Sequence, residues 1–291
     1  MSDLLVVAKQ MEAMGTIQNL TGVFEGIASM RIAQVKNQVL QSQQFFSELW
    51  QMYSQIRVDK EFRFGRTRSD DAIDKQLYII ITAEGGFSGD IDQKLIDTML
   101  QQHNPDKQDI IVIGHHGAVQ LMQRKVNFKK YFTLPARDRN INVQPLVYEV
   151  RRYQSTIVFY QTYVSLMVQD TKRIELQTAV AQEARHVVGE ADDVINEHTY
   201  IFEPSTHEVV AHLERSMMQI ALGQVILDSK LAQYASRFRA MNVARDRVNE
   251  LSDELEMRYN RTKRRTQDER LKEMINGLRK SELHVSARRQ S

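Results

Sequence analysis

The chain has 291 residues, a formal net charge of +2 and no cysteine. The missing thiols exclude disulfides, cysteine zinc sites and cysteine nucleophiles, and the near-neutral charge gives no general attraction to nucleic acid. No apolar run reaches the roughly 20 residues that cross a bilayer, and no basic region precedes the apolar patch near the N-terminus. We therefore expect neither a membrane span nor a signal peptide.

The N-terminal segment predicts one long helix. It contains no proline, and apolar side chains recur every three or four residues. We expect this helix to run from about Ser2 to about Arg57, within a first segment 1–60. Its stripe consists of Met14, Ile17, Leu20, Phe24, Ile27, Val35, Val39, Ser42, Phe46, Leu49, Tyr53 and Ile56.

The middle of the chain, 70–204, predicts a small Rossmann-like α/β domain. Apolar β-branched runs at 75–83 and 109–114 are typical of buried strands, and they alternate with helical patterns at 90–103 and 118–125. This alternation favours a parallel sheet. We expect longer strands at 155–168 and 173–180, antiparallel at one edge, and a short strand at 199–204.

The first strand ends in a glycine-rich stretch, YIIITAEGGFSGDID, that raises the possibility of a phosphate-binding loop. The spacing fits neither GxGxxG nor a P-loop, and flanking carboxylates repel an anion and satisfy the next helix dipole themselves. We expect a structural or interface turn, with Asp90 as helix N-cap and Phe87 as an apolar plug. The residues concerned are Glu84, Gly85, Gly86, Phe87, Gly89, Asp90 and Asp92.

Other candidate chemistry is weak. His115 and His116 are adjacent, so they point different ways, and His207 and His212 are five residues apart rather than the four that place two ligands on one helix face. Ser88 does not lie in a GxSxG elbow. Four acidic residues without a recognisable spacing are expected to form a solvated face: Glu183, Glu190, Asp192 and Asp193. We expect no catalytic, cofactor-binding or metal site.

The C-terminal part, 205–280, predicts a second long helix. Ser205 and Glu208 have capping-box spacing. Apolar residues then alternate in steps of four and three, the 3.5-residue period of a left-handed coiled coil: Leu213, Met217, Ile220, Gln224, Leu227, Leu231, Tyr234, Phe238, Met241, Arg245 and Val248. A helix from about 207 to 276 is roughly 100 Å long and needs a partner.

The simplest partner is the N-terminal helix, in an antiparallel coiled coil; the alternative is that each helix folds back or dimerises with another chain. The basic run at 258–272 has three interpretations. It is a solvated helix face, a nucleic-acid site without interleaved aromatics, or a surface for an acidic protein. We expect the tail 281–291 to be basic and disordered.

Three segments resemble the γ subunit family of F-type ATP synthases. The glycine stretch is similar to the family's ITSDRGLCGGLN, with Ile81, Thr82, Gly86 and Gly89 matching, Phe87 replacing leucine and Asp90 replacing glycine. YIFEPSTHEVV at 200–210 resembles a second family segment. The third, at 228–277, matches at Ser229, Ala235, Arg237, Ala240, Met241, Ala244, Asp246, Leu251, Asp253, Leu255, Tyr259 and Asn260. The lysine-poor N-terminus and the extra cationic tail suggest a divergent N-type bacterial branch.

The resemblance implies a central rotor shaft that is not an enzyme by itself and needs no cofactor. Its expected partners are the α and β subunits, the ε subunit and the c-ring, without nucleic acid. It would lie peripherally on the cytoplasmic side of the bacterial inner membrane. Expected contacts with the catalytic hexamer are Met241, Arg245, Arg258, Tyr259, Arg261, Arg264 and Arg265; those on the c-ring or ε side are Phe87, Ser88 and Glu203.

Two alternatives come from other classes. One is an α/β enzyme with dimerising helical arms, which predicts a ligand at the 85–89 loop. The other is a coiled-coil adaptor that binds nucleic acid through its basic end, which predicts salt-dependent binding to DNA or RNA.

Overall fold

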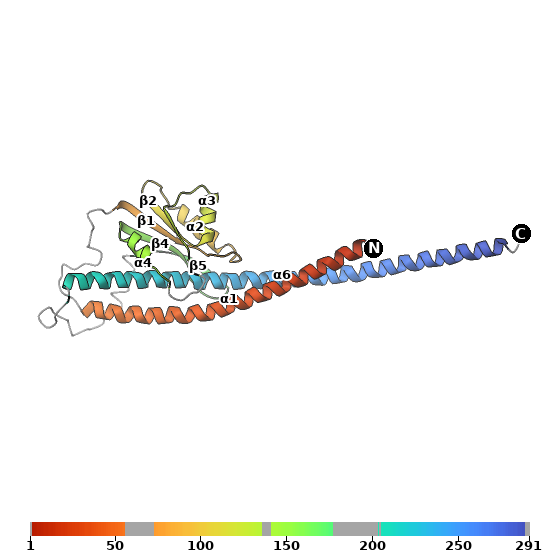
Figure 1. The fold of residues 1–291 in the computed structure, drawn as a ribbon, viewed down its shortest axis with the longest axis horizontal. Helices are drawn as coiled ribbons and strands as arrows, with labels where there is room; N and C mark the ends of the chain where they lie inside the picture. Colours follow the sequence, from red (N-terminus) through yellow and green to blue (C-terminus); the bar gives the residue numbers. More distant parts are fainter. Residues whose placement is uncertain (1, 56–72, 136–140, 177–202, 204, 289–291) are drawn as a thin grey trace. The chain divides into compact units, whose positions relative to one another are not determined.

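A computed structural model describes residues 2–55, 73–135, 141–176, 203 and 205–288. One long helix precedes and another follows a small α/β domain along the chain (Figure 1). The elements in order are α1 (Ser2–Gln55), β1 (Ile73–Ile81), α2 (Ile91–Leu100), β2 (Gln108–Ile113), α3 (His115–Gln123), β3 (Lys130–Phe132), α4 (Gln144–Val150), β4 (Tyr153–Tyr163), β5 (Gln169–Glu175) and α6 (Thr206–Arg288). The mixed fold with long terminal helices confirms the predicted class.

The chain divides into two compact units. One combines Met1–Glu25 with Met241–Ser291, and the other is Gly26–Ala240. The first is called the distal unit below and the second the domain unit. Both long helices pass through both units, and each unit is described by itself.

The sheet of the domain unit has the order β3-β2-β1-β4-β5. The first four strands are parallel, and β5 is antiparallel to β4 at the edge, as predicted. In the central register, Ile79 of β1 pairs with Ile111 of β2 and with Val158 of β4. β1 is buried on both faces, which explains its continuous apolar sequence.

The two faces of the sheet carry separate cores. Tyr78 and Ile80 point toward α2 and α3, whereas Leu77, Ile79 and Ile81 point toward α4 and α6. This alternation follows the two-residue period of a strand. α6 contributes Leu222, Val225 and Ile226 to the second core, so the long helix is itself one layer of the α/β domain.

The long helices run antiparallel. In the domain unit, Val35 and Val39 of α1 pack with Leu231 of α6. In the distal unit, Gln18 Nε2 donates a 2.8 Å hydrogen bond to Asn249 Oδ1, and Glu25 pairs with Arg245 at 2.5 Å. In the distal unit, the partner number on α6 falls from 249 to 245 as the number on α1 rises from 18 to 25. The intramolecular pair, rather than two separate arms, is therefore the observed arrangement.

Several boundaries differ from the predictions. The apolar stretch 164–168, predicted as strand, is a turn in which Val164 N and Ser165 N donate to Val168 O. The last strand therefore lies earlier, at Gln169–Glu175. β3 and α4 were not predicted, because elements of 3 and 7 residues show little periodicity. The strand predicted at 199–204 and the acidic group at 183–193 lie outside the described residues.

The N-terminus of α6 follows the predicted capping pattern. Ser205 Oγ accepts a 3.2 Å hydrogen bond from Glu208 N. At α2, Asp90 occupies the N-cap position but its side chain makes no capping bond. Its carboxylate instead pairs with Lys94 at 2.8 Å, which is why the expected side-chain cap is absent.

Candidate interaction site

The glycine-rich loop after β1 is fastened to α6. Arg237 donates from Nε to Gly86 O at 3.2 Å and from Nη2 to Gly85 O at 3.3 Å. Ser236 Oγ donates to Ser88 O at 2.7 Å. The loop thus presents carbonyl oxygens to a guanidinium and a hydroxyl. Carbonyl oxygens repel a phosphate, so this geometry favours a structural turn over an anion site.

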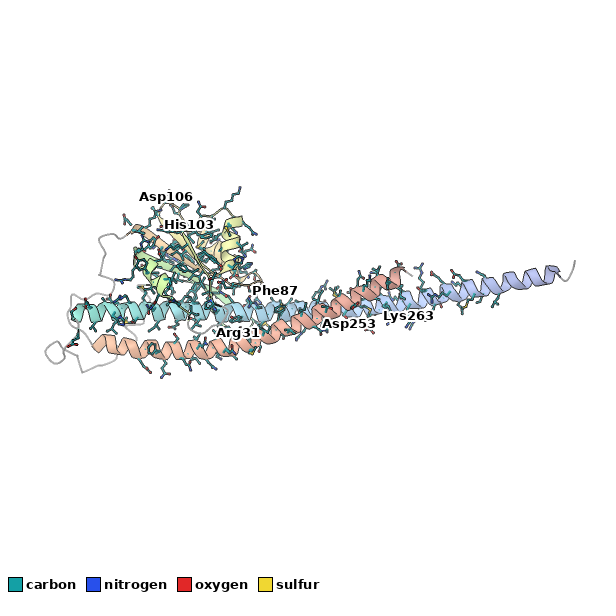
Figure 2. The ribbon with its side chains drawn as sticks, viewed as in Figure 1. Arg31, Phe87, His103, Asp106, Asp253 and Lys263 are labelled. Carbon is teal, nitrogen blue, oxygen red and sulfur yellow. The ribbon has the colours of Figure 1, made fainter. Side chains whose placement is uncertain are left out.

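Phe87 and Ser88 have opposite exposures. Phe87 adopts a positive φ of 66° and is 63% exposed, at the margin of the domain beside α6 (Figure 2). Phe87 therefore does not plug the inside of the turn; its ring lies on the surface, where the expected contact with a partner would need it. Ser88 is buried, so its side chain is not on the surface. Gly89, also at φ 66°, turns the chain into α2 where a side chain would be strained.

A second tight junction lies where β2 passes into α3. Thr82 Oγ1 lies 3.0 Å from Ile113 O, and it accepts a 3.0 Å hydrogen bond from Gly117 N. A Cβ at Gly114, whose φ is 100°, would lie 2.1 Å from Thr82 O. Only glycine fits there, a requirement that no pattern in the sequence predicted.

A buried polar chain links the sheet domain to α6. Asp92, fully buried, accepts from Gln161 Nε2 at 2.8 Å and from Ala83 N at 3.3 Å. Gln161 Oε1 in turn accepts from Ser229 Oγ of α6 at 2.6 Å. At the other end, His116 Nδ1 lies 2.7 Å from Asp92 Oδ2. The hydrogen bond to this carboxylate raises the pKa of His116, against the opposing effect of burial.

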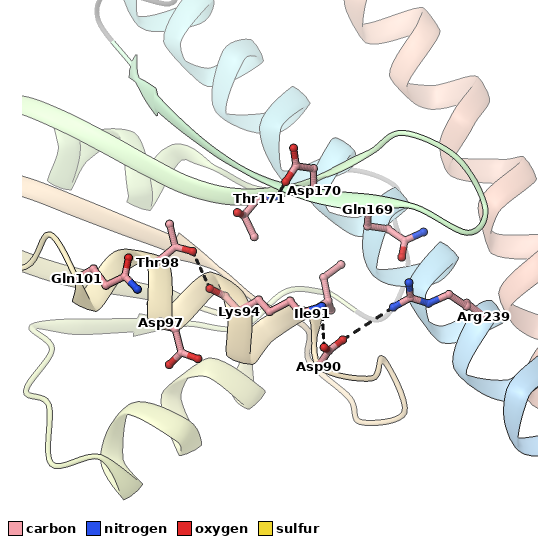
Figure 3. Close-up of a pocket in the computed structure, with 10 residues that line it drawn as sticks. All are labelled: Asp90, Ile91, Lys94, Asp97, Thr98, Gln101, Gln169, Asp170, Thr171 and Arg239. Carbon is pink, nitrogen blue, oxygen red and sulfur yellow. Dashed lines mark hydrogen bonds and ion pairs between the residues drawn. The ribbon is translucent and has the colours of Figure 1, made fainter.

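A cleft of about 430 Å³ opens beside α2 (Figure 3). Its cations are engaged: Asp90 pairs with Lys94 at 2.8 Å and with Arg239 at 3.9 Å. The hydrogen bond from Lys94 lowers the pKa of Asp90. Arg239 also donates to Met167 O at 3.0 Å. The mixed, paired charges select no particular ligand; the lining residues are Asp90, Ile91, Lys94, Asp97, Thr98, Gln101, Gln169, Asp170, Thr171 and Arg239.

In the distal unit, the expected hexamer contacts fall into two groups. Met241 is buried, Tyr259 is half-buried, and Arg245 is held by Glu25. The remaining four arginines are exposed: Arg258, Arg261, Arg264 and Arg265. Arg265 pairs with Glu269 at 3.1 Å. Figure 2 shows Asp253 and Lys263 along the same helix, where acidic and basic side chains are interspersed.

The distal part of α1 differs from its predicted stripe. Ile17 and Leu20, expected in the coiled-coil seam, are exposed. Val7 and Thr21 are buried in this segment, and Met14 and Phe24 of the predicted stripe are half-buried. The outward face of this segment therefore carries large apolar side chains: Leu5, Val6, Ile17, Leu20 and Val23.

The other candidates lie in the domain unit. Glu203, expected on the c-ring or ε side, is exposed. His115 lies near the Tyr131 ring at 6.4 Å, while His116 points to Asp92, so the adjacent histidines do diverge. The described residues contain no group of three potential metal ligands, and none of their helices is apolar enough over a sufficient length to cross a membrane.

Comparison with known proteins decides the family. The sequence profile of the family described as ATP synthase matches residues 3–279. The chain belongs to the ATP synthase family. The ATP synthase gamma chain of Clostridium novyi (strain NT) is 21% identical over 289 residues, which cover 96% of this chain and 98% of that protein. The Enterococcus hirae gamma chain is 26% identical over 223 residues, 70% of each chain.

Solved ATP synthase structures share the fold of this family member. A chain of the Euglena gracilis mitochondrial ATP synthase OSCP/F1/c-ring structure aligns with a TM-score of 0.65 and 14% identity, over 95% of this chain and 94% of that one. A chain of the Tetrahymena thermophila mitochondrial central stalk/c-ring structure aligns with a TM-score of 0.55 and 16% identity, over 77% and 99%. This chain therefore shares its fold, two long helices with an intervening α/β domain, with these solved chains.

The residues that fasten this family member's sheet to α6 were missed as a group. Arg237 and Ser229 had been matched to the family pattern but without a structural role. Small side chains recur on one face of α6, at Ser229, Ala232, Ala235 and Ser236. This stripe of small residues, distinct from the coiled-coil seam, allows the α/β domain to approach the backbone of α6 closely. It was the sequence signal from which the attachment could have been predicted.

Proposed function

We propose that this chain is the central rotor shaft of a rotary ATP synthase, a subunit without catalytic residues of its own. The outward apolar face of α1 in the distal unit carries the proposal. Leu20 and Val23 are 51% and 58% exposed there, although the same helix buries Val7 and Thr21. A helix that is apolar on its outer side as well as at its seam is suited to burial within a larger assembly.

The distal unit is also two-sided. Residues 1–25 carry only four charged side chains, Asp3, Lys9, Glu12 and Glu25. The exposed charged residues of α6 are far denser: Asp246, Arg247, Glu250, Asp253, Glu254, Glu256, Arg258, Arg261, Lys263, Arg264, Arg265, Asp268, Glu269, Arg270, Lys272 and Glu273. A shaft with one apolar and one charged side presents a different surface to each neighbour as it turns.

This asymmetry supplies the mechanism. Within a ring of α and β subunits, each nucleotide site would meet the apolar side and then the charged side in succession. Because a contact shifts an equilibrium only by its differential affinity for two states, the changing surface would bias each site between open and closed forms. The shaft makes and breaks no covalent bond in this scheme.

Charge complementarity gives the exposed arginines a role in that cycle. We assign Arg258, Arg261, Arg264 and Arg265 to acidic surfaces of the catalytic subunits, with Tyr259 beside them; Met241 and Arg245 keep the seam beneath closed. Their exposure supports this assignment. Electrostatic pairs of this kind steer and orient partners more than they add affinity.

The α/β domain would stand on the membrane side of the complex. We propose that Phe87 and Glu203, both exposed, contact the ε subunit or the c-ring, at the cytoplasmic face of a bacterial inner membrane. Similarity to chains from F1/c-ring structures supports this placement. Ser88 would act indirectly, because its carbonyl anchors the loop that presents Phe87.

Reconstitution tests the proposal. The α and β subunits are purified with and without this chain, and ATPase activity is measured for each preparation. We expect the chain to co-purify with the hexamer and to change its turnover. A chain that neither binds the hexamer nor alters its activity would refute the rotor assignment.

Charge reversal then tests the arginine surface. Arg258→Glu, Arg261→Glu, Arg264→Glu and Arg265→Glu are combined, and ATP-driven ion pumping is compared with ATP hydrolysis in the assembled complex. We expect pumping per ATP to fall. The matched control reverses exposed cations of the α/β domain, Lys107→Glu and Arg151→Glu, and should leave the ratio unchanged. An unaltered ratio in the fourfold variant would contradict the assigned role.

A further inference from the structure

The polar chain between His116 and α6 contains one group that titrates near neutral pH. Asp92 is fully buried, and its near neighbours are the Gln161 amide, the Ala83 N–H and the His116 ring. Of these hydrogen-bonding neighbours, only the imidazole can carry a positive charge; the Arg237 guanidinium also acts on Asp92 electrostatically. A buried carboxylate is stable when paired and costly when it is held by neutral donors alone.

His116 can accept a proton without losing a partner. Its side chain is 33% exposed, so solvent reaches the ring. In the neutral form, Nδ1–H donates to Asp92, and Nε2 accepts from Gln120 Nε2 at 3.3 Å. Gln120 Oε1 is buried and has no hydrogen-bond partner among the described residues. A half-turn of this amide would let Oε1 accept from the second N–H of a charged ring.

Two further hydrogen bonds connect Asp92, and with it the charge state of His116, to α6. Gln161 is held by Asp92 through its amide nitrogen and holds Ser229 through its oxygen. Gln233 Nε2, one turn farther along α6, donates to Ser229 Oγ at 3.0 Å. We propose that protonation of His116 tightens the attachment of the α/β domain to α6, so that this chain of hydrogen bonds is a pH-sensitive latch.

The sign follows from linkage. Asp92 raises the pKa of His116 in the folded chain. A group with a raised folded pKa contributes stability that is complete below its unfolded pKa, about 6.5 for histidine, and that is lost as pH rises through the folded pKa. The latch is therefore tight in mild acid and looser in mild alkali.

Other charged and titratable groups lie on the elements that surround this chain of hydrogen bonds. Arg237 on α6 remains a cation, although burial lowers its pKa. Glu84, in the loop after β1, accepts from His115 N at 3.2 Å. Asp97 on α2 pairs with Arg124, and His115 lies beside the Tyr131 ring. At the start of α2, Asp90 pairs with Lys94. On α6, Asp228 and Lys230 flank Ser229: burial raises the pKa of Asp228, and Lys230 donates to Pro135 O at 3.1 Å.

Hydrogen exchange on the full-length chain tests the latch. Protection factors, corrected for the intrinsic pH dependence of exchange, are compared at pH 6.0 and 8.5. Peptides spanning 83–92 and 226–237 report on the attachment, and a peptide spanning 108–113 of β2 serves as internal reference. Because a hydrogen bond from a charged donor exceeds a neutral one by about 1 kcal/mol, we expect protection at the attachment to fall roughly fivefold relative to β2.

His116→Asn removes the titration while keeping an N–H near the Nδ1 position. The expected result is equal protection at both pH values. His115→Asn, on the same helix turn but outside the chain of bonds, should behave as wild type. An undiminished fivefold loss in His116→Asn, or a loss that is equal in β2, overturns the latch.

A measurement on the unmodified chain covers the case in which the variant does not fold. In an NMR titration, the His116 ring should show a midpoint above that of an unstructured histidine. The Gln161 side-chain amide should move with the same midpoint. A Gln161 amide that is indifferent to the His116 transition would refute the coupling. Neither experiment involves the catalytic subunits, so the result is independent of the rotor assignment.

Discussion

The apolar outer face of α1 allows a sharp test. We consider the double substitution Leu20→Asp and Val23→Asp in the distal unit. Both side chains are more than half exposed, and exposed substitutions usually change stability by within about 0.5 kcal/mol each. The isolated chain should therefore melt within a few degrees of wild type.

The double substitution should weaken binding of this chain to the catalytic hexamer far more than it lowers the stability of the free chain. Full burial of a leucine or valine side chain is worth about 1.5–3 kcal/mol, so covering the exposed half contributes roughly 1 kcal/mol for Leu20 and for Val23. Each aspartate that is buried against an apolar surface of the surrounding subunits adds a desolvation cost of several kcal/mol. A total above about 5 kcal/mol corresponds to a loss of affinity of more than roughly a thousandfold.

The assay compares thermal melting of the free chain with co-purification and ATPase activity of the reconstituted hexamer. Met122→Asp, 57% exposed on α3 of the α/β domain, is the matched control. We expect this control to assemble normally. If the double variant assembles like wild type, or if Met122→Asp is equally defective, the outer face of α1 is not the buried surface and the reasoning fails.

Three further outcomes are expected. Gly114→Ala should lower the free energy of unfolding by about 2–4 kcal/mol in thermal denaturation, because its Cβ would lie 2.1 Å from Thr82 O at a positive φ, whereas Gly86→Ala has open space and should cost under about 1 kcal/mol. Val35→Ala should cost about 1–3 kcal/mol, because it opens a cavity in the helix pair; a loss in denaturant titration below 0.5 kcal/mol, roughly the scatter of surface substitutions, would contradict that packing. Burial raises the pKa of Tyr160 to about 12, so stability should fall between about pH 10 and 12 as the unfolded chain ionises first; ultraviolet titration against Tyr160→Phe checks this, and a midpoint near 10 would refute it.

The seam of α6 was predictable because its periodicity is regular. Steps of four and three residues identified Leu231 and Met241, which the structure buries. The same approach failed on distal α1, where it assigned Ile17 and Leu20 to the seam. Periodicity identifies an apolar face but not the surface that covers it. When another subunit can supply the cover, the larger side chains can point outward.

The attachment of the α/β domain could be predicted only in part. The four parallel strands follow from buried apolar runs, but the turn at 164–168 is also apolar and resembled strand. It is ordered by its own hydrogen bonds and by Arg239. The two bonds of the Asp92–Gln161–Ser229 chain join residues that are 69 and 68 positions apart in sequence, and a single sequence gives no signal for such pairings.

The layer that α6 contributes to the sheet has a consequence for biosynthesis. Among the described residues, α4 covers part of the core beneath Leu77 and Ile79, and Leu222, Val225 and Ile226 of α6 add the next layer. At 5–20 residues per second, the ribosome needs roughly 3–10 s to add the 50 residues from Leu176 to Ile226. During that interval, the part of this sheet face that α4 does not cover is open to other nascent chains. We expect this subunit to depend on a chaperone or on slow translation before its last helix emerges.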